Sequence, residues 1–366
     1  MNARSAALAL TLAALSPALH AQDAAPATKV DWGGFVDTYY AWDFQRPYNF
    51  DRAYTTQPAR HAEFNVNLAF VDAKLSGERV RGRLALQWGT SVQANYAGEP
   101  KIGSISGPEV SRYIQEATVG YRVSPKVWLD GGIFPAHLGY ESWISRDNLT
   151  YTRSMVAEFS PYYEAGVKLT WAASPKVTAT VAVLNGWQDI SVYNTPPAGG
   201  LRLDYSPSPK LTLSYDNFVG NAAADSAQAR IRFYQDAIVQ YKPGSRWQLA
   251  AVVAHGLQTN SADSQGTGTW WGTVLIAKYQ PTPVFGLVGR FEEYSDPHAI
   301  IVATGVPSSF RATGASIGTD LTLASRVLWR TELRTFRSPG DIWPTHEAGT
   351  LTSHDTVVVT SMAVSF

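Results

Sequence analysis

The chain has 366 residues, with 30 lysines and arginines balanced by 30 aspartates and glutamates, and it contains no cysteine. The balanced charge excludes the extended basic surface that nucleic acids require, so no nucleic-acid partner is predicted. The lack of cysteine excludes a disulfide framework, while aromatic residues make up 12% of the chain and indicate an extensive apolar surface.

The first 21 residues have the features of a secretory signal peptide. A single basic residue, Arg4, precedes a stretch rich in alanine and leucine, and the small residue Ala21 follows it. We expect cleavage between Ala21 and Gln22, which leaves residues 22–366 as one domain. Beyond this segment no apolar run reaches the roughly 18 residues that a transmembrane helix needs.

Seven tight turns divide the rest of the chain into hairpins. Proline and glycine favour turn geometry, and proline cannot donate to a strand ladder, so these sites mark strand ends. Seven hairpins give fourteen strands, and one strand at each end brings the predicted total to sixteen. The turns lie at 76–79, 124–126, 174–176, 208–210, 242–246, 280–283 and 324–326, and the end strands at 30–42 and 355–366.

The segments between turns alternate in polarity with the period of two expected of strands. A change of phase near Val71 predicts a β-bulge in the segment 64–75. The predicted outward faces are Val80, Leu84, Leu86 and Trp88; Tyr163, Val167, Leu169 and Trp171; and Val327, Trp329 and Leu333. The predicted inward faces include Arg81, Arg83, Gln87, Glu164, Lys168, Arg330, Glu332 and Arg334.

Aromatic residues lie close to the tight turns, mostly on the outward face, as expected of a girdle at a membrane interface. Long irregular connections alternate with the short turns, which is the asymmetry of outer-membrane barrels. A soluble β-sandwich would explain the alternation but not the girdle, the turn asymmetry and the signal peptide together. The girdle residues are Tyr121, Trp171, Tyr205, Tyr241, Trp247 and Tyr279.

The sequence therefore predicts an all-β fold, a transmembrane antiparallel up-and-down β-barrel of about 16 strands with short periplasmic turns and long extracellular loops. The last strand carries an apolar face of Met362, Val364 and Phe366. It resembles the closing strand of bacterial outer-membrane barrels, which typically ends in an aromatic residue. This resemblance implies that the barrel-assembly machinery recognises Phe366.

Several stretches resemble the OmpL-like β-barrel porin family of bacterial outer membranes. The resemblance extends over most of residues 30–220 and becomes weaker towards the C-terminus. It implies a bacterial outer-membrane location and a lipid bilayer as partner. The stretches are Gln93–Tyr96, Phe134–Ser142, Asp147–Asn148, Tyr151–Ser154, Ser160–Gly166 and Leu184–Trp187.

Sixteen strands enclose an aqueous lumen, and the inward faces carry many charges. The longest connection, residues 135–161, is expected to fold into the lumen, as in the general porins that this topology resembles, with a short helix within 152–159. The alternative is a loop that caps the mouth. The predicted pore-lining and constriction residues are Arg81, Arg83, Glu116, Glu141, Asp147, Arg153, Glu158, Arg290, Arg330 and Arg334.

We expect the loop acids Glu141, Asp147 and Glu158 to face the wall across the pore. The wall residues opposite them are predicted to be Arg83, Arg290 and Arg330, so that a transverse electric field makes permeation sensitive to charge. No nucleotide-binding, metalloprotease or serine-hydrolase motif is present in the sequence, and the histidines are scattered. We therefore predict no catalytic residue, no cofactor and no bound metal.

The leading functional prediction is a porin that forms a water-filled channel for passive diffusion of small hydrophilic solutes. One alternative is a porin selective for sugars or small anions. The other is a protein without transport activity, either an outer-membrane enzyme or an adhesin. The sequence leaves open whether the barrel forms a homo-oligomer.

Overall fold

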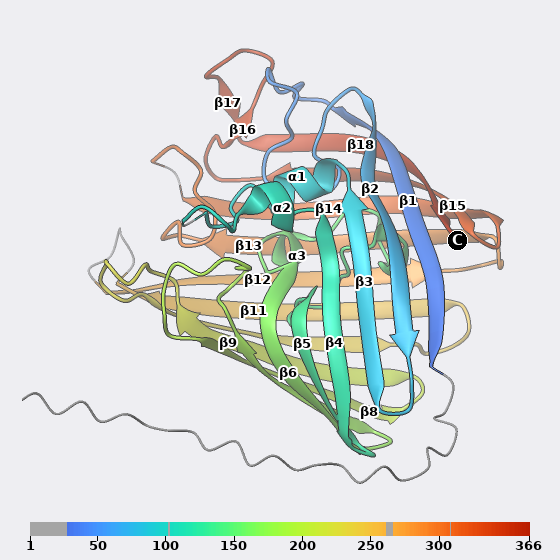
Figure 1. Ribbon diagram of the computed structural model, residues 1–366. Helices are drawn as coiled ribbons and strands as arrows, with labels where there is room; N and C mark the ends of the chain where they lie inside the picture. Colours follow the sequence, from blue (N-terminus) through green and yellow to red (C-terminus); the bar gives the residue numbers. More distant parts are fainter. Residues whose placement is uncertain (1–27, 102, 261–265, 308) are drawn as a thin grey trace, which may run out of the picture.

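The structure, a computed structural model, describes residues 28–101, 103–260, 266–307 and 309–366. Within these residues sixteen long strands form a closed antiparallel barrel, and β1 pairs with β18 to complete it (Figure 1). The predicted fold class and strand number are confirmed, whereas the predicted signal peptide lies outside the described residues. The strands are β1 Lys29–Asp43, β2 Phe64–Ser76, β3 Val80–Trp88, β4 Ile114–Ser124, β5 Val127–Pro135, β6 Tyr163–Ser174, β7 Val177–Leu184, β8 Ala198–Ser208, β9 Leu211–Asn221, β10 Ile231–Tyr241, β11 Trp247–Thr259, β12 Thr267–Tyr279, β13 Phe285–Asp296, β14 Phe310–Ala324, β15 Val327–Arg337 and β18 His354–Ser365.

The two ends of the barrel differ. Each of the seven predicted turns joins two consecutive strands at one end, and the long connections gather at the other (Figure 1). The long connections contain α1 Thr90–Asn95, α2 Pro108–Ser111, a 3₁₀ turn at Ser145–Asp147, α3 Met155–Glu158 and the two-residue strands β16 Trp343–Pro344 and β17 Leu351–Thr352. Among the described residues, no helix has the length and apolar character needed to cross a bilayer.

The predicted alternation places apolar side chains outside and polar side chains inside. Leu84 and Trp329 are exposed on the outer surface, whereas Gln87 and Arg330 are buried in the interior. In the predicted aromatic girdle, the ring centroids of Trp247 and Tyr279 lie 4.8 Å apart on neighbouring strands. The barrel thus presents an apolar exterior, as a lipid-embedded sheet requires, and places many of its charged side chains inside.

Two details of the strand prediction were wrong. The bulge in β2 lies at Asn67 and not near Val71, because Asp37 pairs with Leu68 while Thr38 pairs with Val66. The extra residue, Asn67, points inward, and its amide donates to Asp37 Oδ2 at 2.8 Å. Tyr163, expected on the outer face, is fully buried because the β3–β4 connection covers it, with Tyr96 stacked at 4.2 Å between ring centroids.

The C-terminal residue takes part in closing the barrel. The backbone N–H of Phe366 donates to Gly34 O at 3.0 Å, and the N–H of Gly34 donates to Phe366 O at 3.0 Å. The Phe366 side chain remains 57% exposed. The ring crosses the backbone of Gly34, where a Cβ atom would lie 2.3 Å from it, so glycine at position 34 leaves room for the terminal aromatic ring.

A glycine on β5 has a backbone conformation that other residues rarely adopt. Gly132 has a φ of 129°, and a Cβ atom there would lie 2.0 Å from Ala117 O on β4. We expect Gly132→Ala to lower the free energy of unfolding by roughly 1–3 kcal/mol. Urea titration of the folded barrel, followed by tryptophan fluorescence, measures the change.

The neighbouring Gly131 provides the matched control, because a Cβ atom there has no neighbour closer than 3.8 Å. Gly131→Ala should therefore shift the unfolding midpoint much less than Gly132→Ala does. Equal shifts in the two variants would show that the backbone conformation at Gly132 is not strained by a side chain.

Candidate functional site

The connection between β5 and β6, residues 136–162, runs into the interior of the barrel (Figure 1). The Ser145 hydroxyl donates to Asp37 Oδ2 on β1 at 2.8 Å. The Met155 N–H donates to Glu292 Oε2 at 2.7 Å, on β13, which lies across the ring from β5. These contacts confirm that the loop folds inward instead of capping the mouth. The predicted short helix is also present as α3, and Ser154 Oγ caps it by accepting from the Ala157 N–H.

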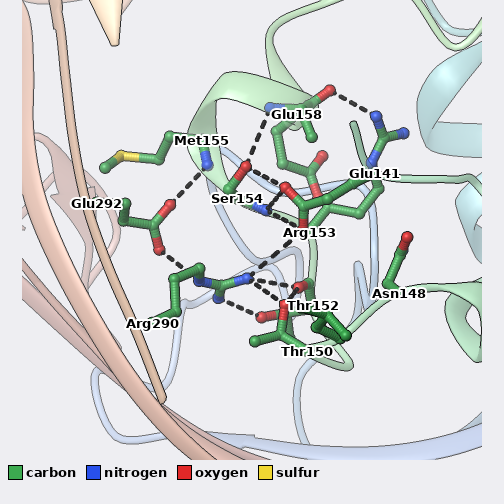
Figure 2. A network of polar contacts seen from close by, with 12 residues as sticks. Glu141, Asn148, Thr150, Thr152, Arg153, Ser154, Met155, Glu158, Arg290 and Glu292 are labelled. Carbon is green, nitrogen blue, oxygen red and sulfur yellow. Dashed lines mark hydrogen bonds and ion pairs between the residues drawn. The ribbon is translucent and has the colours of Figure 1, made fainter. Parts of the chain in front are cut away.

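A buried group of two arginines and two glutamates holds the middle of this loop. Figure 2 shows two of its members, Arg290 and Glu292, beside the loop. Arg290 Nη1 donates to Thr152 O at 2.6 Å, and the Thr152 N–H donates to Glu332 Oε2 at 2.8 Å. Arg334 Nη2 donates to Glu292 Oε1 at 2.7 Å. Each of the four charged side chains is at most 1% exposed. Buried charges must stay paired, so this group fixes the position of the loop against β13 and β15.

Two further arginines hold the part of the loop that lies deepest in the lumen. Arg330 Nη2 donates to Leu149 O at 2.6 Å, and its Nε donates to Asp320 Oδ1 at 2.8 Å. Arg146 Nη1 donates to Ser365 Oγ at 2.7 Å, close to the tight-turn end. The loop therefore extends along the β14, β15 and β18 wall through most of the barrel's height.

Two acidic residues of the loop, Glu141 before α3 and Glu158 within it, are engaged in contacts within and between loops. Glu158 Oε2 accepts from the Thr56 N–H and the Tyr162 hydroxyl, both at 2.9 Å, which ties the loop to the β1–β2 connection. Glu141 accepts from the Ser154 N–H at 3.1 Å, and Arg290 Nη1 lies 3.9 Å from its other oxygen. Both carboxylates are thus turned towards protein partners.

Apolar packing fills the lumen on the same side as these polar anchors. Apolar residues of the loop belong to one buried cluster with inward residues of β10 to β14, so the loop packs directly against that side of the wall. The cluster includes Leu138, Leu149, Met155 and Val156 from the loop and Ile238, Val252, Val274, Ile276, Val288 and Phe310 from the wall.

Two cavities lie on the opposite side, next to β2–β6. The larger has a volume of about 600 Å³ and reaches Ser76 and Gly77 at a tight turn. The smaller has a volume of about 240 Å³ and lies between the loop and the wall. Arg83 lines both cavities and pairs with Asp72 and Glu116, in each case at 2.8 Å. Arg83 therefore lies beside open space in the lumen.

The structure separates the predicted pore-lining residues into two groups. Arg81, Arg83 and Glu116 line the larger cavity, and Arg83, Glu141 and Arg153 line the smaller one. Arg290, Arg330, Arg334 and Glu158 are buried where the loop meets the wall or another loop. The expectation that loop acids face Arg290 and Arg330 across water was wrong, because both arginines contact the loop directly.

Asp147 differs from the other two loop acids because its side chain is exposed. It belongs to the 3₁₀ turn at Ser145–Asp147, inside the lumen. Partial burial raises the pKa of Asp147, and the nearby positive charges of Arg146 and Arg83 partly offset this effect. Asp147 is thus the one of the three predicted loop acids that stays exposed, and it lies close enough to Arg83 for their charges to interact.

Several residues of the site were missing from the predicted set. Thr150 Oγ1 accepts from Arg290, and Thr152 Oγ1 donates to Glu332. No sequence pattern distinguishes these two threonines from other loop threonines. Lys168 lines the larger cavity, with its ammonium 4.2 Å from the centroid of the Phe134 ring. The alternation in the sequence placed Lys168 on the inward face of its strand, but Lys168 was not among the predicted constriction residues.

A family model described as "Putative beta-barrel porin-2, OmpL-like" matches residues 29–366. The match extends to the C-terminus, beyond the region of about 30–220 where the sequence motifs showed the resemblance. No curated protein matches the chain significantly.

Among solved structures, the chain is similar to the outer-membrane channel DcaP of Acinetobacter baumannii, with a TM-score of 0.63, 12% identity, and 93% of this chain and 97% of that chain covered. It is also similar to an anion-selective porin from Comamonas acidovorans, with a TM-score of 0.57 and 12% identity, and the match covers 93% of this chain and 100% of that chain. OmpF of Salmonella typhi, solved with daunomycin, has a TM-score of 0.59, 12% identity, and coverage of 93% and 98%. At these identities the likeness establishes the fold.

The buried charge group indicates how the loop can be released from the barrel wall. Arg290→Gln removes a cation that Glu292 and Glu332 share, at 3.1 and 3.0 Å. Two buried carboxylates then lose a partner, a change that typically costs about 3–5 kcal/mol. We expect the loop to leave the wall, so that single-channel conductance in planar bilayers rises and trypsin cleaves after Arg146 or Arg153.

Arg311→Gln is the matched control, because Arg311 lies on the adjoining strand β14 and its side chain is 59% exposed, 3.9 Å from Glu293. It should leave both conductance and cleavage unchanged. If Arg290→Gln also leaves them unchanged, the charge group does not hold the loop.

Proposed function

The chain belongs to the OmpL-like β-barrel porin family, and we propose that small hydrophilic solutes cross it passively along the side of the lumen next to β2–β6. It is an outer-membrane porin with a closed sixteen-strand barrel in its described residues. The observation that carries the proposed route is the pair of cavities that share Arg83, on the side that the inward loop leaves open.

The charges along this route favour weak selectivity. The larger cavity is lined by four bases, Lys74, Arg81, Arg83 and Lys168, and by three acids, Asp72, Glu116 and Asp130. Arg81 pairs with Asp130, and Arg83 pairs with Asp72 and Glu116, so the wall is polar and nearly neutral. Such a wall hydrates neutral solutes and excludes neither sign of ion strongly.

We propose a channel without a catalytic step, because the family and the fold are those of porins. We also propose that the tight turns face the periplasm and that the apolar exterior contacts the bilayer. A homo-oligomer is a further proposal: OmpT of Vibrio cholerae, which has a similar fold with a TM-score of 0.55 and 9% identity, has been solved in a trimer form.

We expect the charge of Asp147 to influence the ion selectivity of this route. Asp147→Asn removes the exposed loop carboxylate beside Arg83, so we expect the permeability ratio to shift towards anions by about two- to fivefold, as expected for one charge screened by water. Reversal potentials under a salt gradient measure this ratio. Asp225→Asn, which changes an exposed acid in the β9–β10 connection, serves as the control and should cause no shift.

We expect the ion selectivity to depend on pH through the same carboxylate. Because the pKa of Asp147 is raised, protonation begins at a higher pH than for an ordinary aspartate and removes the negative charge as the pH falls. Wild-type selectivity should therefore move towards anions on acidification, and Asp147→Asn should reduce this change. An identical pH profile in the two proteins would place Asp147 outside the conduction path.

We expect loss of Phe366 to impair assembly of the barrel. The terminal residue pairs with Gly34 where β1 meets the end of β18, and its ring is exposed on the outside. We propose that the assembly machinery recognises this residue, so deletion of Phe366 should reduce the amount of inserted barrel in cells. Insertion measured by heat-modifiable gel mobility tests the proposal, and an undiminished amount would contradict it.

A further inference from the structure

Arg153 is a buried arginine with unused hydrogen-bonding capacity. It is 3% exposed, and its Nη2 donates to Ala157 O at 2.8 Å. The guanidinium carbon lies 3.6 Å from the centroid of the Tyr162 ring, which engages the face of the cation. Its Nε and Nη1 atoms have no hydrogen-bond partner among the described residues. An unsatisfied buried cationic donor is costly, so an acceptor is expected beside it.

The 240 Å³ cavity lies at this position. Arg153 lines it together with the aromatic residues Tyr140, Trp143 and Tyr162. Gln115 also lines the cavity, and its Oε1 atom is buried without a hydrogen-bond partner among the described residues. The volume is several times the roughly 30 Å³ that one water molecule occupies in the liquid. The cavity therefore combines an unsatisfied cation and an unsatisfied acceptor with flat apolar walls.

The other charged side chains of the cavity are already neutralised by partners. Arg83 is held between Asp72 and Glu116, as described above. Glu141 accepts from Ser154, and Figure 2 shows its carboxylate between Ser154 and Arg290. Burial raises the pKa of Glu141, which further weakens its negative charge, although Arg290 and Ser154 partly offset this effect.

We propose that this cavity is a binding subsite for a small organic carboxylate with a flat apolar body. One carboxylate oxygen accepts from Nη1 of Arg153, a charge-assisted hydrogen bond of the kind that guanidinium groups favour. The apolar body packs between the rings of Tyr140, Trp143 and Tyr162. Gln115 Oε1 accepts from a hydroxyl or amine donor on the solute. This subsite rests on the proposed route, because solutes reach the cavity through the lumen.

Benzoate and its neutral isostere benzamide test the subsite on the unaltered protein. Calorimetric titration of the folded full-length barrel in detergent should show saturable benzoate binding, with benzamide at least about tenfold weaker because it lacks the charge. Equal affinities for the two ligands, or no saturable benzoate binding, would overturn the proposal. An adventitious apolar pocket predicts equal affinities.

Arg153→Gln identifies the residue that binds the carboxylate. It should weaken benzoate binding at least about tenfold while leaving benzamide binding unchanged, and Arg153→Lys should restore part of the benzoate affinity. Arg230→Gln, which removes an exposed arginine of the β9–β10 connection, is the matched control and should bind benzoate as the wild type does. Unchanged benzoate binding in Arg153→Gln would contradict the assignment.

Bilayer conductance separates this proposal from the proposed route. A wild-type channel that conducts but does not bind benzoate refutes the subsite and leaves the route standing. Saturable benzoate binding by a barrel that does not conduct leaves the subsite standing and refutes the route.

Discussion

The pairing of Arg290 and Arg334 with Glu292 and Glu332 is the interaction on which the interior of this barrel depends. These side chains are fully buried, and two of them, Arg290 and Glu332, also bind backbone groups of the inward loop. Buried ions are expensive to separate, so the loop and the β13–β15 wall behave as one unit. The position of the open passage follows from this attachment, because the loop occupies the opposite half of the lumen.

Strand order, strand number and the facing of most side chains were predictable from the sequence because they depend on local chemistry. Ser-Pro-Lys turns mark where strands end, and alternation from Val80 or Val327 determines which side chains face outward. The two errors had tertiary causes. Asn67 forms the bulge because its amide binds Asp37 on the neighbouring strand, and Tyr163 is buried because a connection from elsewhere in the chain covers it.

The site was only partly predictable, for a physical reason. The alternation along the strands identified Arg290 and Arg330 as inward-facing residues. It could not show which of them would bind the loop instead of facing water. Those contacts join residues far apart in sequence, such as Arg330 and Leu149, 181 positions apart, and many of them are to backbone carbonyls that any residue supplies. Arg83 remains beside open space because its partners, Asp72 and Glu116, are on adjoining strands.

We propose that solutes pass beside β2–β6 and not along the β10–β14 wall. The chain has no cysteine, so single cysteines can be introduced without a background. Thr118→Cys lies in the larger cavity, and Val274→Cys lies under the loop, where the native side chain is 1% exposed. Modification by a charged, water-soluble thiol reagent should reduce single-channel current in Thr118→Cys and leave Val274→Cys unaffected. Block of Val274→Cys with no effect on Thr118→Cys would contradict this account of the lumen.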